Sequence, residues 1–235
     1  MRKLERFRDA HLGERCVIVC NGPSLNAMDL TVLRGEVVFG MNKIHLGLAR
    51  FGFYPRYLVA VNDKVIEQAA NELARMTCIK FLSRNGVGKL PGGLEGKLAE
   101  NAFTYHIKTR SVEDRFCRDI SVGVREGGTV TYAALQIAHY MGFHDVIIIG
   151  MDHRYTFTGK PNETKRMDGP DPNHFSPAYF QGKTWDNPDL ARSEESYALA
   201  RDVFAASGRR IRDATLDGEC QVFEKADFRA LMAQA

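Results

Sequence analysis

The sequence predicts an α/β fold, a doubly wound, mostly parallel, Rossmann-like sheet with one irregular lid segment. Two observations predict it. Short apolar runs alternate with helical patterns along the chain, which is the pattern of repeated βα units. Several of these runs are followed directly by small polar residues, as expected at the carboxyl edge of a parallel sheet. With 235 residues, 44% of them hydrophobic, the chain can bury one sizeable core, so we expect a single domain over residues 1–235.

The predicted strands are short apolar runs bounded by turn formers, which is typical of strands buried on both faces of a sheet. Two of the intervening segments, residues 63–76 and 129–141, repeat apolar side chains at helical spacing, so each is expected to form an amphipathic helix. The expected strands, the last of them weaker than the others, are residues 16–20, 36–40, 57–61, 78–82, 103–107, 145–150 and 210–213.

Two stretches interrupt this alternation. Residues 83–102 are rich in glycine and are equally consistent with a surface loop and with a substrate lid. Residues 154–190 contain several prolines and few apolar runs, and they begin just after the polar strand end at Asp152. We therefore expect residues 154–190 to form a lid-like insertion over a site at that edge.

The run VIVCNGPSL, residues 17–25, combines a buried strand, a Gly-Pro turn and a serine that can cap a helix. Gly22 lets main-chain N–H groups approach a ligand closely. A strand, a tight turn and a helix start together form an anion site, usually for a nucleotide phosphate. We therefore place Asn21, Gly22 and Ser24 in a nucleotide site, with an ordinary βα turn as the alternative.

Polar residues also follow three further predicted strands, namely Asn42, Asn62 and Asp152. Each of them alone is explained by a turn or a helix cap. Because the carboxyl ends of parallel strands meet at one edge, the three together favour a polar binding rim.

A second glycine turn, Gly127-Gly128-Thr129, precedes the helix expected at residues 129–141. The free N–H groups and the positive dipole end at a helix start suit an anionic group such as a phosphate. A capped helix with a flexible entry is the structural alternative.

Composition excludes several classes of protein. The net charge is only +3, and no Lys/Arg tract is interleaved with aromatic residues, so no nucleic-acid partner is expected. No apolar stretch approaches the roughly 20 residues that span a bilayer. The five scattered cysteines show neither zinc-site spacing nor a disulfide framework, which fits a reduced cytoplasm. The N-terminal MRKLERFR lacks the apolar segment of a secretory signal, and it fits a docked leader helix or a helix at the inner face of the membrane.

The motif NGPSL at 21–25, the asparagines after the next two strands, the GGT turn at 127–129 and the run VIIIGMDHRY at 146–155 form an ordered set. This set resembles the 6-hydroxymethylpterin diphosphokinase MptE-like family, related to the CMP-sialic acid-dependent sialyltransferases of the Campylobacter type. The resemblance covers roughly residues 15–63 and 125–180. It implies a nucleotide-dependent transferase domain, and the bacterial branch it most resembles is associated with surface-polysaccharide synthesis.

The resemblance also implies roles for individual residues. Tyr155 would donate a hydrogen bond to the leaving phosphate. His174, in the segment after the strand, would take the proton of the acceptor hydroxyl, because an imidazole titrates near neutrality. His153 is a rival for this role. Catalysis is thus assigned to His174 and Tyr155, and nucleotide binding to Asn21, Gly22, Ser24, Asn42, Asn62, Gly127, Gly128, Thr129 and Asp152.

Three functions follow from the resemblance. The leading one is a glycosyltransferase that uses a CMP-activated acidic sugar in bacterial surface-glycan synthesis and needs no metal or other cofactor. The second is a 6-hydroxymethylpterin-type diphosphokinase that needs ATP and Mg²⁺. Asp152, Asp168 and Asp171 could then hold the metal, but they lack a fixed ligand spacing, which favours solvated loop acids instead. The third is a non-catalytic nucleotide-binding accessory protein. The expected partners are a nucleotide-activated donor and a glycan or small alcohol acceptor, with homo-oligomerisation left open.

Overall fold

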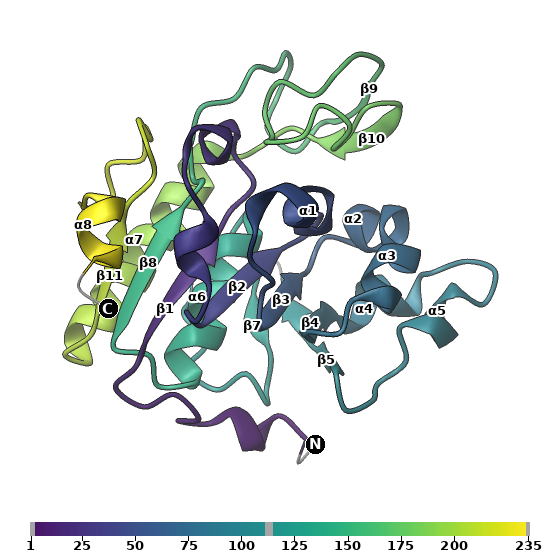
Figure 1. Cartoon of the computed structure of the whole chain (residues 1–235). Helices are drawn as coiled ribbons and strands as arrows, with labels where there is room; N and C mark the ends of the chain where they lie inside the picture. Colours follow the sequence, from purple (N-terminus) through teal and green to yellow (C-terminus); the bar gives the residue numbers. More distant parts are fainter. Residues whose placement is uncertain (1–2, 111–114, 234–235) are drawn as a thin grey trace.

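The computed structural model describes residues 3–110 and 115–233. Its centre is a parallel sheet in the order β12-β11-β8-β1-β2-β3-β4-β5, flanked by helices on both faces (Figure 1). The α/β, doubly wound fold expected from the sequence is confirmed. The strands are β1 (Arg15–Val19), β2 (Val38–Met41), β3 (Tyr57–Ala60), β4 (Ile79–Ser83), β5 (Thr104–Ile107), β8 (Asp145–Ile149), β11 (Arg210–Asp213) and β12 (Glu224–Lys225).

Strand β1 lies at the point where the winding direction of the sheet reverses. Val17 pairs with Val38 of β2 on one side and with Ile147 of β8 on the other. From β1 the chain moves outward through β2 to β5, and it then returns to β8 and continues outward through β11 and β12. In open parallel sheets such a reversal leaves a crevice beyond the carboxyl ends of the strands, here those of β1 and β8.

Each face of the sheet has its own hydrophobic core, because alternate side chains of a strand point to opposite faces. On one face Cys16 and Ile18 of β1 pack in the core that includes α6 (Val130–Tyr140) and α7 (Leu190–Ala206). On the other face Val17 and Val19 pack in the core of the remaining helices. These helices are α1 (Leu48–Phe51), α2 (Asp63–Gln68), α3 (Ala70–Arg75), α4 (Arg84–Gly88), α5 (Leu94–Lys97) and α8 (Phe228–Met232).

Several elements differ from the sequence-based expectation. The helix expected over residues 63–76 is broken into α2 and α3 at Ala69, whose φ of −119° and ψ of 12° leave the helical region. The glycine-rich residues 83–102 contain α4 and α5. The turn after β1 leads into a short 3-10 helix, η2 (Pro23–Ala27), rather than an α-helix.

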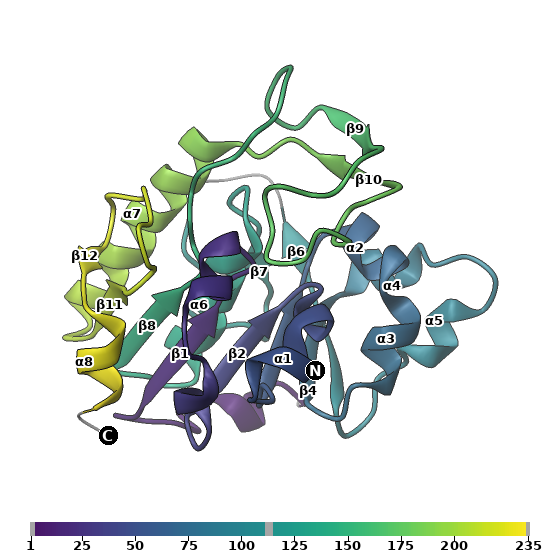
Figure 2. The same cartoon turned by 45° about the horizontal axis from the view of Figure 1, so that its top comes forward.

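Residues 154–190 lie over the carboxyl edge of the sheet, at the top of Figures 1 and 2. They contain an antiparallel hairpin of β9 (Thr164–Met167) and β10 (Lys183–Asp186). The hairpin is fastened to α2 by the ion pair of Lys64 with Asp186 and by Gln68 Nε2, which donates to Thr184 O at 2.8 Å. We call residues 154–190 the lid.

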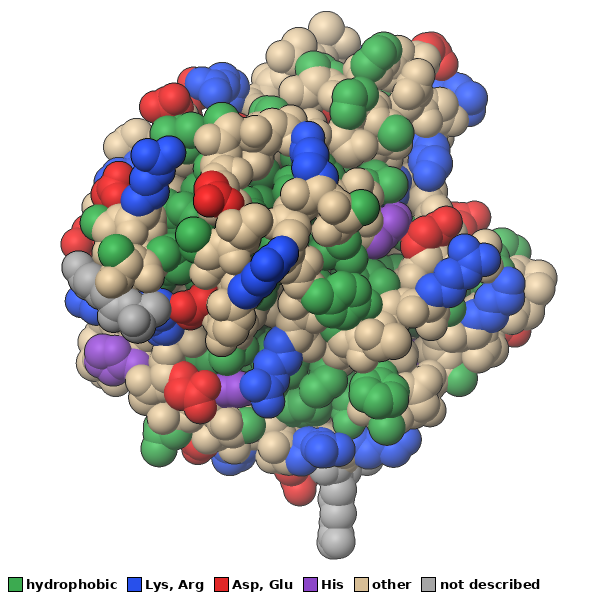
Figure 3. Space-filling model, viewed as in Figure 1, with side chains coloured by type: hydrophobic (Ala, Val, Ile, Leu, Met, Phe, Trp, Pro, Cys, Tyr) green, Lys and Arg blue, Asp and Glu red, His purple; other side chains and the backbone are tan. Residues whose placement is uncertain are grey.

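The molecular surface seen in Figure 3 is hollowed between the lid and the helices to its right, and it carries Lys/Arg and Asp/Glu side chains interspersed. Across the described part of the chain, no helix combines the length and the apolar character that crossing a membrane would require.

Candidate functional site

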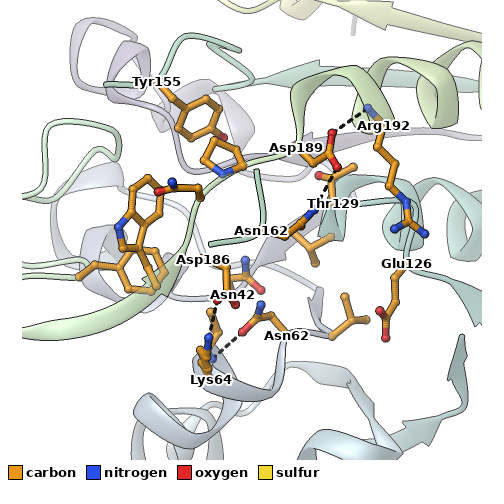
Figure 4. Close-up of a pocket in the computed structure, with 18 of the residues that line it drawn as sticks. Asn42, Asn62, Lys64, Glu126, Thr129, Tyr155, Asn162, Asp186, Asp189 and Arg192 are labelled. Carbon is orange, nitrogen blue, oxygen red and sulfur yellow. Dashed lines mark hydrogen bonds and ion pairs between the residues drawn. The ribbon is translucent and has the colours of Figure 1, made fainter. Parts of the chain in front are cut away.

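Two adjoining cavities lie beneath the lid at the carboxyl edge. The larger, about 460 Å³, is bounded by the start of α2, the start of α6, the lid and the start of α7 (Figure 4). The smaller, about 90 Å³, lies at the carboxyl ends of β1 and β8. We call the two together the cleft. Both are lined by Asn42, Thr129, Val130, Tyr155 and His174.

The cleft brings together most of the residues that the sequence assigned to a site. Ser24 and Gly127 line neither cavity. A Cβ on Gly127 would lie 2.4 Å from Tyr132 Cδ1, so this glycine serves the packing of α6 on α7. The residues that the sequence assigned to a site and that do line the cleft are Asn21, Gly22, Asn42, Asn62, Gly128, Thr129, Asp152, Tyr155 and His174.

The turn after β1, residues 21–24, binds a carboxylate of the chain itself, that of Asp152. Ser24 donates its backbone N–H to Asp152 Oδ1 at 3.0 Å and its hydroxyl to Oδ2 at 2.7 Å. Gly22 N–H donates to Gly150 O at 2.8 Å, and a Cβ on Gly22 would lie 1.8 Å from Asp152 Oδ2. Gly22 is therefore needed for close approach to the end of β8. Nucleotide binding by this turn stays a prediction, and a phosphate here would have to compete with Asp152.

Two asparagines at the strand ends have acceptor atoms without partners. The Oδ1 atoms of Asn21 and Asn42 are buried and accept no hydrogen bond from the described residues. Both side chains line the smaller cavity. Asn42 has a φ of 51°, in the left-handed region that asparagine tolerates better than most residues. A buried acceptor without a donor is costly, so these atoms suit a ligand that brings hydroxyl or amino groups.

The start of α6 offers unused donors to the cleft. Thr129 caps the helix by accepting from Thr131 N–H at 3.3 Å. The N–H groups of Gly128 and Val130 have no hydrogen-bond partner among the described residues, and both residues line the larger cavity. Because a helix of this length carries partial positive charge at its start, the two amides suit an anionic group.

His174 forms a pair with a buried carboxylate. Its Nδ1 lies 2.8 Å from Asp171 Oδ2, and the Asp171 side chain is fully buried. The ring stacks on Tyr179 with centroids 3.9 Å apart and an interplanar angle of 9°. Nε2 has no hydrogen-bond partner among the described residues. This arrangement leaves one ring nitrogen available to a substrate in the cleft, as a general base requires.

Tyr155 lies at the cleft wall with 36% of its surface exposed (Figure 4). Protein atoms nevertheless surround the rest of the side chain, and this burial, with the nearby Cys20 as the second cause, raises the pKa of its phenol. The hydroxyl therefore stays protonated at neutral pH and can donate to an anionic ligand.

The other polar candidates have partners within the chain. Asn62 caps α2, accepting from Val65 N–H at 3.1 Å. His153 Nε2 lies 2.9 Å from Glu194 Oε1, so this rival base is already engaged. Asp168 is exposed and pairs with Arg166, away from Asp152 and its partner Ser24. In residues 3–110 and 115–233, no three His, Cys, Asp or Glu side chains gather into a metal-ligand cluster.

Some residues that line the cleft or contact its lining were not singled out from the sequence as site residues. Asp171 was considered only as a metal ligand, although the spacing Asp-x-x-His is the local signal that relates it to His174. The start of α7 was missed, although Asp189 is a typical N-cap and accepts from Arg192 N–H at 3.2 Å. Trp185 and Phe180 belong to the lid and form a tilted ring pair that lines the larger cavity.

Lys43 anchors the lid to the end of β2. It is 1% exposed, and its ammonium group donates to Tyr179 O and to Gln68 Oε1, each at 2.7 Å. The ammonium also lies 4.2 Å from the ring centroid of Phe180. Burial, and then the proximity of Lys183, lowers the pKa of Lys43 to about 7.

This burial predicts a pH-dependent stability. Between pH 7 and 10.5 the unfolded chain keeps the Lys43 proton that the folded chain has lost, so the free energy of unfolding rises with pH in this range. We expect the wild type to gain about 1–2 kcal/mol more than Lys43→Met between about pH 6 and 9, measured by urea denaturation. Equal gains in the two proteins would contradict the depressed pKa.

The sequence profile of the 6-hydroxymethylpterin diphosphokinase MptE-like family matches residues 1–158, so Asp171 and His174 lie beyond the matched segment. Among curated proteins no match reaches significance.

Two solved structures superpose on the chain. The MAf glycosyltransferase from Magnetospirillum magneticum AMB-1 does so with a TM-score of 0.59 and 12% identity over 95% of this chain. This chain spans 35% of the length of that protein. The sialyltransferase CstII from Campylobacter jejuni, in complex with a substrate analogue, cytidine-5'-monophosphate, superposes with a TM-score of 0.38 and 10% identity. That superposition covers 91% of this chain and 85% of CstII.

Proposed function

This chain belongs to the 6-hydroxymethylpterin diphosphokinase MptE-like family, and from that premise we propose that it is a nucleotide-dependent glycosyltransferase. The proposed donor is a CMP-activated acidic sugar, and the proposed setting is bacterial surface-glycan synthesis. One observation carries the proposal. His174, which is paired with the buried Asp171, lines the same cavity as the two unpartnered amides at the start of α6.

The paired His174 suits activation of the acceptor in a glycosyl transfer, and the amides of α6 suit departure of the leaving group. His174 Nε2 takes the proton of the acceptor hydroxyl, whose oxygen forms a bond to the anomeric carbon of the sugar. The bond from that carbon to the phosphate oxygen breaks, and negative charge collects on the leaving CMP. Amides of α6 and the Tyr155 hydroxyl donate hydrogen bonds to this charge, which stabilises the transition state. The unpartnered Oδ1 atoms of Asn21 and Asn42 accept hydrogen bonds from hydroxyl or amino groups of the nucleotide.

The charge of the larger cavity disfavours a triphosphate more than a donor with one phosphate. The two cationic side chains that line it, Lys64 and Arg192, are outnumbered by three acidic ones, Glu126, Asp186 and Asp189 (Figure 4). Lys64 is already paired with Asp186. A triphosphate requires more positive charge than this, commonly from lysine, arginine and magnesium together.

The second candidate is an ATP- and Mg²⁺-dependent diphosphokinase acting on a pterin-like alcohol. The description of the family favours it, because the matched profile carries that name. It would use the same base, since a hydroxyl is the nucleophile in both reactions. A non-catalytic nucleotide-binding accessory protein is the third candidate.

A ligand screen separates the three. We expect CMP and CDP to raise the melting temperature by several degrees, while ATP with Mg²⁺ has a smaller effect. We also expect release of CMP from CMP-N-acetylneuraminate, used as a probe donor. A larger shift with ATP and Mg²⁺, with AMP formed in the presence of 6-hydroxymethyl-dihydropterin, would favour the diphosphokinase. A shift without turnover of either donor would favour the accessory protein.

A further inference from the structure

The two oxygens of Asp171 have different partners. Oδ1 accepts the backbone N–H of Asn173 at 2.8 Å, and Oδ2 lies 2.8 Å from His174 Nδ1. The carboxylate is fully buried. A buried carboxylate is an acceptor at both oxygens, so the hydrogen atom of the second contact belongs to the imidazole.

We propose that Asp171 is a positioning residue that fixes His174 with its proton on Nδ1 and with a bare Nε2 toward the cleft. The catalytic consequence of this tautomer rests on the proposed function, whereas the tautomer itself does not. A neutral imidazole accepts a proton only at the nitrogen that carries none, so the partner of Nδ1 decides whether Nε2 acts as a base.

The surroundings leave the ring little other freedom. Tyr179 stacks on one face of the imidazole, and Phe180 contacts the imidazole in a T-shaped arrangement with centroids 5.3 Å apart. Tyr179 is itself held by Lys43, whose backbone N–H donates to the phenol oxygen at 3.3 Å. The backbone of the loop is also bonded, because Asp171 N–H donates to Pro177 O at 2.8 Å. With the orientation of the ring fixed by packing, the position of the proton is set by Asp171.

This geometry predicts what Asp171→Asn does. The N–H of Asn173 still requires an acceptor, so the amide oxygen takes the place of Oδ1 and the amide NH₂ takes the place of Oδ2. The NH₂ group then donates to Nδ1, and the imidazole proton moves to Nε2. The variant keeps the shape of the loop but turns the nitrogen that faces the cleft from an acceptor into a donor.

The test measures the tautomer directly, by ¹⁵N NMR of the histidine side chains at about pH 9, where imidazoles are neutral. The His174 signals are assigned by their loss in His174→Gln. We expect the wild type to carry its proton on Nδ1 and Asp171→Asn to carry it on Nε2. A matched control, Asp168→Asn, changes an exposed carboxylate of the same lid and should leave the tautomer unchanged.

A proton on Nε2 in the wild type would overturn the proposal without reference to any variant. A tautomer that is the same in Asp171→Asn as in the wild type would also overturn it. For CMP-N-acetylneuraminate turnover we expect Asp171→Asn to lower kcat by about 100-fold with KM nearly unchanged. If the tautomer changes as expected but neither the wild type nor any variant turns over the donor, the proposed function fails while the positioning role stands.

Discussion

Replacement of His174 by alanine is expected to lower turnover of the nucleotide-activated donor by about 10²–10⁴-fold, the usual loss when a general base is removed. The imidazole lines both cavities, and its pairing with Asp171 leaves Nε2 to the cleft. The affinity for CMP should stay close to that of the wild type, because the base acts on the acceptor. Initial rates at saturating donor, together with calorimetric titration of CMP, measure the two quantities separately.

His153→Ala is the matched control for this prediction. His153 also lines the smaller cavity, but its Nε2 is engaged by Glu194, and its φ of 55° lies in the left-handed region. We expect it to lose less than about 10-fold in turnover. Unchanged turnover in His174→Ala would remove His174 from the mechanism. A larger loss in His153→Ala than in His174→Ala would move the base to the end of β8.

The sheet could be predicted from the sequence because its strands carry strong local signals. Residues 16–20 and 145–150 contain apolar runs with a polar residue shortly after them, Asn21 and Asp152, and they form the adjacent strands β1 and β8. The packing of α6 was also predictable, since its apolar residues recur at helical spacing. Helix α7 was not predicted, because it buries a narrow stripe that includes Tyr197, Ala200 and Phe204 among many charged residues.

The site was predictable to the extent that it depends on strand ends. The rule that parallel strands bring their carboxyl ends to one edge placed Asn42, Asn62 and Asp152 near one another, and the cleft contains all three. Their hydrogen bonds could not be predicted, because they depend on tertiary contacts. Ser24 binds Asp152 across 128 residues of sequence, and no local pattern reports such a distance.

The pair of Asp171 with His174 shows a different limit. The two residues are close in sequence, so the contact was available to sequence reasoning in principle. What the sequence did not show is that the carboxylate is buried and that Asn173 occupies its other oxygen. Burial decides whether such a pair is a solvated loop contact or an oriented base, and burial here comes from the packing of the lid on the core.

Replacement of Gly128 by valine is expected to weaken CMP binding by about 10–100-fold, the range for losing hydrogen bonds to a charged group. Gly128 has a φ of 77°, in the left-handed region that a β-branched residue avoids at a cost of about 1–2 kcal/mol. Relief of this strain rotates the neighbouring peptides, which moves the Gly128 N–H away from the cleft and disturbs the cap of α6. Calorimetric titration with CMP measures the effect.

Gly208→Val is the control that separates strain from binding. Gly208 has a φ of 67° and open space around it, and it follows the far end of α7. Both variants should therefore lose similar stability in urea, but only Gly128→Val should lose affinity. The Cβ of residue 128 would point toward Arg192 at 3.4 Å, an ordinary contact, so loss of affinity would not follow from a collapsed fold. If both variants bind CMP as the wild type does, the start of α6 is not the anion site, and the phosphate must be held elsewhere in the cleft.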